Sequence, residues 1–144
     1  MIIEPIIWHL SKQYFKMNFT ISTTINCSVN QIFECWLSSK GHTDMTGGEA
    51  TASAEEGAEF SAWDGYIWGK NLIVENNKRI VQSWRTSEFK EGEPDSQIEV
   101  LFSEVNGQST ITLHHTNLPA DGGHYKKGWE DHYFEPMTVF FEKL

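Results

Sequence analysis

Three turn signals in the middle of the chain constrain its fold most strongly. Asp64-Gly65, Asn76-Asn77 and Asn106-Gly107 each separate two segments whose pattern is typical of strands. Asp-Gly and Asn-Gly are the strongest signals for a two-residue hairpin, because both central positions need a positive φ. With one more turn at residues 55–57, the region predicts about six antiparallel strands.

The segment before this region predicts a strand and one or two short helices. Residues Phe19 to Ile25 alternate apolar and polar side chains, which is strand periodicity. Ser28 and Gln31 form a capping-box pair in front of an amphipathic stretch, so residues 29–38 are predicted to be helical. One further helical turn is expected over residues 39–46.

The end of the chain changes to helical periodicity. Apolar residues recur at helical spacing over residues 124–144, which predicts one long helix with a broad apolar face. Pro136 lies inside this helix and should kink it, because it cannot donate a hydrogen bond to the carbonyl of His132. The order of elements predicts an α+β fold, in which a curved antiparallel sheet of about seven strands is wrapped on the long C-terminal helix.

The length of 144 residues suits one domain, which we place at residues 17–144. Residues 1–16 are interpreted as an N-terminal extension, and an edge element of the same domain is the alternative. The net charge of −9 opposes binding to phosphate backbones and anionic lipid, so neither nucleic acid nor a membrane is an expected partner.

The cysteines and the N-terminus indicate a cytoplasmic protein. Cys27 and Cys35 are eight residues apart, which matches no zinc spacing, so two reduced thiols are expected. The apolar run from Ile2 to Leu10 does not resemble a signal peptide, because an acidic residue and a proline interrupt it. We expect neither a metal nor a cofactor, since the adjacent His114 and His115 point to opposite faces of a strand and cannot chelate one ion together.

Strand parity assigns the two faces of the sheet, because a two-residue turn pairs its flanking residues on the same face. Across the Asn-Gly turn, Val100 pairs with Leu113 and Ile98 pairs with His115. This face is almost wholly apolar, so it is predicted to be the inner face.

The Asn-Asn turn extends the inner face to polar residues. It pairs Ile73 with Ile80 and, further along the strands, Asn71 with Gln82. Asn71 and Gln82 therefore point inward, as His115 does. A buried polar group without a partner costs about 1–3 kcal/mol, so these side chains either bond to backbone or line a polar-tipped cavity.

The same parity sends three aromatic rings to the outer face. Trp63, Tyr66 and Trp68 flank or follow the Asp-Gly turn and are predicted to point outward together. A clustered aromatic outer face is unusual for a monomer, so we interpret these rings as a surface for a protein partner or a second copy of the chain. The alternatives are that residues 1–16 fold back over the rings, or that a strand bulge turns one ring inward.

One set of motifs runs through the whole domain: Met45-Thr46-Gly47, Gly57-x-x-Phe60, Asp64-Gly65-Tyr66-Ile67-x-Gly69, Arg79-Ile80-Val81-x-x-Trp84-Arg85, Leu118-Pro119 and Gly128-Trp129-x-x-x-Tyr133-Phe134. From about Asn18 to Phe141 the chain resembles the activator of heat-shock-protein-90 ATPase homologue family. The resemblance implies the helix-grip fold of the START-like (SRPBCC) superfamily, with a hydrophobic cavity between sheet and C-terminal helix and no fixed catalytic set. The named eukaryotic members are co-chaperones, so the resemblance also implies a possible role in the stress response.

Binding rather than catalysis is the expected function, because the sequence contains no nucleophile elbow and no glycine-rich phosphate loop. We expect a hydrophobic small molecule or lipid-like ligand in the cavity. The alternatives are a protein-interaction module that regulates a heat-shock chaperone ATPase, and an enzyme that uses the cavity for cyclisation or hydrolysis. Inward parity and the C-terminal helix face predict nine ligand-binding residues: Trp36, Met45, Ile67, Asn71, Gln82, Trp84, His115, Trp129 and Tyr133.

Overall fold

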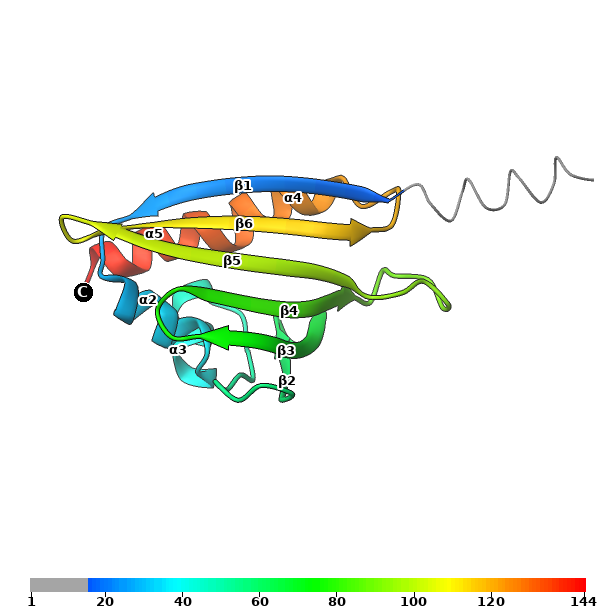
Figure 1. The fold of residues 1–144 in the computed structure, drawn as a ribbon, viewed down its shortest axis with the longest axis horizontal. Coiled ribbons are helices and arrows are strands. Elements are labelled where there is room, and N and C mark those ends of the chain that lie inside the picture. The colour runs from blue at the N-terminus through cyan, green and yellow to red at the C-terminus, as the bar shows by residue number, and fades with distance from the viewer. Residues whose placement is uncertain (1–15) are drawn as a thin grey trace, which may run out of the picture.

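The computed structural model describes residues 16–144, and their strands form one antiparallel sheet. The predicted N-terminal extension, residues 1–16, lies outside the described residues except for Lys16. The sheet has the strand order β1-β6-β5-β4-β3-β2 (Figure 1). The strands are β1 (Met17–Ile25), β2 (Glu59–Ala62), β3 (Ile67–Glu75), β4 (Arg79–Thr86), β5 (Ser96–Val105) and β6 (Gln108–Leu118).

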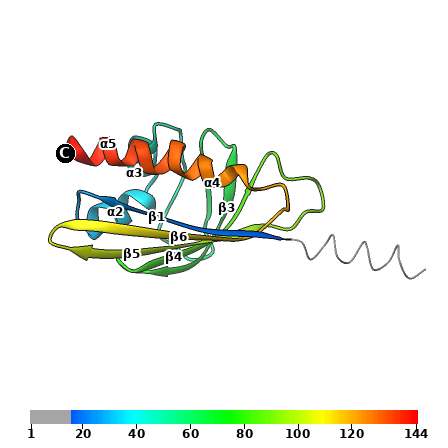
Figure 2. The same ribbon diagram turned by 90° about the horizontal axis from the view of Figure 1, so that it is seen from above.

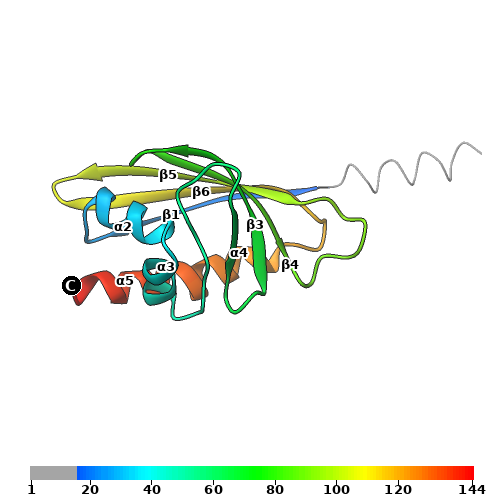
Figure 3. The same ribbon diagram turned by 90° about the horizontal axis from the view of Figure 1, so that it is seen from below.

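All the helices lie on one side of this sheet. The C-terminal helix runs across the sheet as a second layer (Figure 2), and α2 and α3 lie on the same side (Figure 3). The α+β arrangement predicted from the order of elements is therefore confirmed, and it is the helix-grip fold that the resemblance implies. The helical elements are α2 (Val29–Trp36), α3 (Ser39–Thr46), α4 (His124–Trp129), the π-helical turn η1 (Glu130–Phe134) and α5 (Glu135–Glu142).

The sheet has six strands rather than about seven. The segment expected to form the additional strand makes only an isolated bridge, between Thr51 and Ser61. The side-chain amide of Asn71 donates hydrogen bonds to the carbonyls of Ser53 and Glu55, at 2.8 and 2.9 Å. These carbonyls are therefore satisfied by a side chain instead of a neighbouring strand.

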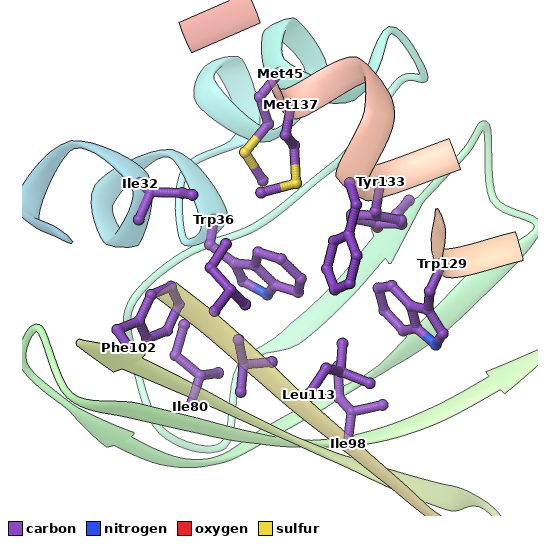
Figure 4. Close-up of a cluster of buried hydrophobic side chains, with 14 of the residues drawn as sticks. Ile32, Trp36, Met45, Ile80, Ile98, Phe102, Leu113, Trp129, Tyr133 and Met137 are labelled. Carbon is purple, nitrogen blue, oxygen red and sulfur yellow. The ribbon is translucent and has the colours of Figure 1, made fainter. Parts of the chain in front are cut away.

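The predicted register of β5 and β6 is confirmed. Ile98 pairs with His115 and Val100 with Leu113, and the turn closes between Val105 and Gln108. The side chains of Ile98, Val100, Leu113 and His115 are at most 1% exposed. The inner face therefore lies where strand parity places it, and it packs against the rings of α2 and the C-terminal helix (Figure 4).

The register near the Asn-Asn turn differs from the prediction by one residue. Ile80 pairs with Val74 instead of Ile73. Of the two turn residues, only Asn77 has a positive φ (60°). The turn therefore cannot be the two-residue type that needs positive φ at both positions, and the loop gains a residue. An irregularity between Asn71 and Ile73 cancels the shift, so the predicted pairing of Asn71 with Gln82 is present.

Pro136 is accommodated by the π-helical turn that precedes α5. The N–H of Glu135 donates to the carbonyl of Glu130, five residues back, instead of four. A π-helical turn inserts an extra residue into the helical path, and such turns are frequent at functional sites. The interruption expected at Pro136 thus takes the form of a wide turn, and the helix continues beyond it.

Candidate functional site

A groove of about 590 Å³ lies between the start of the C-terminal helix and the loop that joins β2 to β3. We call it the aromatic groove, because half of the residues that line it are Trp or Tyr. Its lining residues are Trp63, Tyr66, Ile67, Trp84, His124, Tyr125, Lys127, Gly128, Trp129, Asp131, His132 and Tyr133.

Four of the nine predicted ligand-binding residues line the aromatic groove: Ile67, Trp84, Trp129 and Tyr133. The other five do not border it and are packed inside the protein, at most 2% exposed: Trp36, Met45, Asn71, Gln82 and His115. Figure 4 shows the rings of Trp36, Tyr133 and Trp129 side by side above the sheet. The ring of Trp36 is therefore packed between sheet and helices and does not border this groove.

His115 is held in a chain of hydrogen bonds that fixes its tautomer. The indole N–H of Trp129 donates to Nδ1 of His115 at 3.0 Å, so Nε2 carries the imidazole proton. Nε2 then donates to Oγ of Ser96 at 2.9 Å, and Ser96 donates to the carbonyl of Trp84 at 2.6 Å. Burial lowers the pKa of His115 to about 3, which keeps it neutral. The inward histidine therefore ties the C-terminal helix to the sheet.

The pair Asn71 and Gln82 is satisfied in a similar way. The amide of Gln82 donates to Oδ1 of Asn71 at 2.8 Å, and Oε1 of Gln82 accepts a longer hydrogen bond from the indole of Trp36 at 3.5 Å. Asn71 is bound in turn to the backbone of the segment before β2. Of the two alternatives left open by the sequence, bonding to backbone applies to Asn71, whereas the partners of Gln82 are side chains.

A buried histidine–tyrosine pair was not predicted. Nδ1 of His42 donates to the carbonyl of Trp36 at 2.9 Å, so Nε2 accepts a hydrogen bond from the hydroxyl of Tyr133 at 2.7 Å. Burial lowers the pKa of His42 and raises the pKa of Tyr133. The spacing of His42 from the buried Met45 and Thr46 is a signal that this histidine faces inward.

The three rings predicted to share the outer face separate in the structure. Trp63 and Tyr66 are half-buried and form the wall of the aromatic groove, whereas Trp68 is 40% exposed on the outer face. Strand β2 ends at Ala62 and β3 begins at Ile67, so the loop between them has four residues instead of two. Strand parity does not apply to Trp63 and Tyr66, because both belong to this longer loop.

Trp63 has an unusual position at the wall of the groove. Its φ is 51°, a left-handed conformation that is uncommon for a bulky residue. Its indole N–H is buried without a hydrogen-bond partner, and its ring contacts the ring of His132 edge-on, with centroids 5.4 Å apart. A Cβ at Gly48 would lie 2.5 Å from the indole, so only glycine leaves room for this ring.

Polar side chains gather at one end of the groove. The hydroxyl of Tyr66 donates to the carboxylate of Glu88, and Nε2 of His124 lies 3.7 Å from the same carboxylate. The hydroxyls of Tyr125 and Thr86 are hydrogen-bonded at 2.5 Å. Burial, with a smaller contribution from the bond to Glu88, raises the pKa of Tyr66 above its ordinary value. We call Tyr66, Glu88 and His124 the polar rim.

Helical spacing could have identified more of the lining residues. Tyr125, Gly128, Trp129 and His132 follow one another at spacings of three, one and three residues, which places them on one helix face. The prediction used only the apolar members of this face and so omitted Gly128 and His132. Tyr125 was omitted because the apolar residues used for the prediction begin one turn later, at Trp129.

Two kinds of site are not found in residues 16–144. No group of three or more His, Cys, Asp or Glu side chains there is placed to hold a metal ion. No helix of this part of the chain has both the length and the apolar character needed to cross a membrane.

The sequence matches one protein-family model. The model described as "Activator of Hsp90 ATPase homolog 1-like protein" matches residues 26–142. The human "Activator of 90 kDa heat shock protein ATPase homolog 1" is 26% identical over 123 residues, which cover 85% of this chain and 36% of that protein. A Dictyostelium discoideum relative with the corresponding description is 29% identical over 97 residues, 66% of this chain and 25% of its own length. The chain thus spans about a third or less of these curated relatives.

The fold is also found in solved structures. The crystal structure of an HSP90 activator from Plasmodium falciparum superposes with a TM-score of 0.77 at 24% identity, over 85% of this chain and 94% of that one. At this identity the likeness establishes a shared fold.

Proposed function

We propose that this chain, which belongs to the Activator of Hsp90 ATPase homolog 1-like family, binds a hydrophobic small molecule in the aromatic groove. The observation that carries the proposal is the groove itself, whose volume of about 590 Å³ falls in the range of small-molecule sites. Its walls are mostly aromatic, and a ligand that covers them removes apolar surface from water. Ile67, Trp84, Trp129 and Tyr133 would then contact the ligand, together with Trp63, Tyr66 and Tyr125.

Binding without catalysis agrees with the state of the polar groups around the groove. The hydroxyl of Tyr133 and the indole N–H of Trp129 are each used in a hydrogen bond to a buried histidine. Burial lowers the pKa of both histidines, so neither is ready to act as a proton donor near neutral pH.

Gly128 offers a direct test of the proposal. It lines the groove, and a Cβ added there would meet no heavy atom within 4 Å. Gly128→Leu should therefore project a side chain into the groove and block it, whereas Gly128→Ala should leave most of the space open. Binding would be measured by titrating the neutral fluorophore N-phenyl-1-naphthylamine into the wild-type chain and both variants. Binding to the wild type and to Gly128→Ala, but not to Gly128→Leu, is expected. Absence of binding to the wild type, or equal binding to all three, would refute the proposal.

A second candidate function is regulation of a chaperone ATPase. It is favoured by the match to the human activator of the 90 kDa heat shock protein ATPase. Of the three rings predicted for protein interaction, Trp68 lies on the outer face, and Leu72 of the same strand is 46% exposed. The test is the ATP hydrolysis rate of a 90 kDa heat shock protein with and without this chain. Stimulation that Trp68→Ala reduces would support this function, and an unchanged rate would exclude it for that chaperone.

A further inference from the structure

The aromatic groove is lined by Trp and Tyr rather than by Phe. The chain contains six Trp and four Tyr, and three of each line the groove. None of the Phe residues within residues 16–144 lines it, although the chain contains nine Phe. A groove that needed only apolar area would accept Phe equally well. Trp has the ring face that attracts cations best.

The polar tips of four of these six rings are used in hydrogen bonds within the protein. The indole N–H of Trp129 and the hydroxyl of Tyr133 bind His115 and His42. The hydroxyls of Tyr125 and Tyr66 bind Thr86 and Glu88. At these four rings a ligand in the groove meets ring surfaces rather than free hydrogen-bond donors, whereas the buried indole N–H of Trp63 has no partner.

The charges beside the groove favour a cation. Among residues 16–144, Lys127 is the only Lys or Arg that lines the groove, and it is paired with Asp131 at 2.8 Å. The carboxylate of Glu88 lies at the polar rim, between the hydroxyl of Tyr66 and the ring of His124. The whole chain carries a net charge of −9, which adds to a negative potential at this site.

We propose that the ligand of the aromatic groove is an organic cation, an alkylated ammonium group attached to an apolar body. This inference rests on the proposed function and narrows it. The ammonium group lies against the faces of the Trp and Tyr rings, where the ring quadrupoles attract it. The carboxylate of Glu88 supplies the opposite charge, and the apolar body covers the rest of the groove.

A pair of probes of nearly equal shape tests the inference. The cation 4-(trimethylammonio)benzyl alcohol and the neutral 4-tert-butylbenzyl alcohol differ in one atom and in charge. Titration calorimetry at pH 8 should give an affinity for the cation that is about fivefold higher or more, and Gly128→Leu should abolish both interactions. If the neutral compound binds equally or better, the inference is wrong and the proposed function stands. If neither compound binds, the inference fails, and the fluorophore titration decides the proposed function separately.

A variant that removes the charge of Glu88, compared with a matched control, measures what the polar rim contributes to the affinity for the cation. Glu88→Gln keeps an acceptor for Tyr66 but removes the charge, and should lower the affinity for the cation about threefold without changing that for the neutral compound. Glu91→Gln removes a charge from an exposed position of the same loop and should change neither. An equal loss for both compounds in Glu88→Gln, or no loss for the cation, would contradict the role of Glu88.

Discussion

Replacing Gly128 by alanine should stabilise the protein, although the residue lies in the proposed binding site. Gly128 is inside a helical segment that continues into the π-helical turn, and a Cβ there meets no heavy atom within 4 Å. Glycine costs about 0.8–1.0 kcal/mol relative to alanine in a helix interior, because its unfolded backbone has more freedom to lose. The free energy of unfolding should rise by this amount, which corresponds to about 3 °C in Tm for a domain of this size.

The assay is urea unfolding followed by tryptophan fluorescence, and two other glycines provide the contrast. A Cβ at Gly69 would lie 1.9 Å from the backbone oxygen of Ser83, and one at Gly48 would lie 2.5 Å from the ring of Trp63. Gly69→Ala and Gly48→Ala should therefore each destabilise by about 1–3 kcal/mol. A neutral or destabilising Gly128→Ala would refute the reasoning, because it would mean that the space beside Gly128 is not open.

Three more predictions follow from the buried side chains. Trp84→Ala should lower the free energy of unfolding in urea by about 3–5 kcal/mol, because Trp84 is only 3% exposed. It should also weaken binding of the neutral fluorophore. Unchanged fluorophore binding would mean that Trp84 is a core residue only. Tyr133→Phe should cost about 1–3 kcal/mol, because Nε2 of His42 loses its donor; an unchanged unfolding midpoint would contradict this. Since the pKa of His115 falls from 6.5 to about 3 on folding, its contribution to stability is complete above pH 6.5 and is lost as the pH falls toward 3. Across this range the free energy of unfolding of the wild type should fall by up to about 1.4 kcal/mol per pH unit. The His115→Asn variant should show a smaller fall, and the His114→Asn variant should show the same fall as the wild type.

The faces of the central strands could be predicted from the sequence because each residue there has only two possible directions. Ile98 and Val100 lie on the inner face as predicted, since the Asn-Gly turn fixes their pairing and one-residue errors would expose an apolar row. The same reasoning failed at Trp63 and at Ile73. Both lie next to turns that have more residues than expected, and turn length depends on which residues adopt positive φ.

The candidate site was less predictable than the fold, because inward direction does not distinguish a packed side chain from a lining one. Trp36 and Trp129 both point toward the space between sheet and helix, but only Trp129 reaches the groove. Which of them borders open space depends on how helices α2 and α3 fill one end of that layer. Strand parity assigns a side chain to one face of the sheet, but it does not predict how the helices pack against that face.

The polar residues of the interior limit what kind of ligand the proposed site would recognise. Each inward histidine, amide or serine is used to connect two elements, as in the chain from Trp129 through His115 to Ser96. These bonds hold the rings in place, but they also remove the donors that a polar ligand would need. A ligand rich in hydroxyl or amide groups would leave those groups unpaired on binding, at a cost of about 1–3 kcal/mol each. If the groove binds a ligand as proposed, its selectivity would come from ring faces, shape and the charge of Glu88, and the contrast between cationic and neutral probes of equal shape tests this directly.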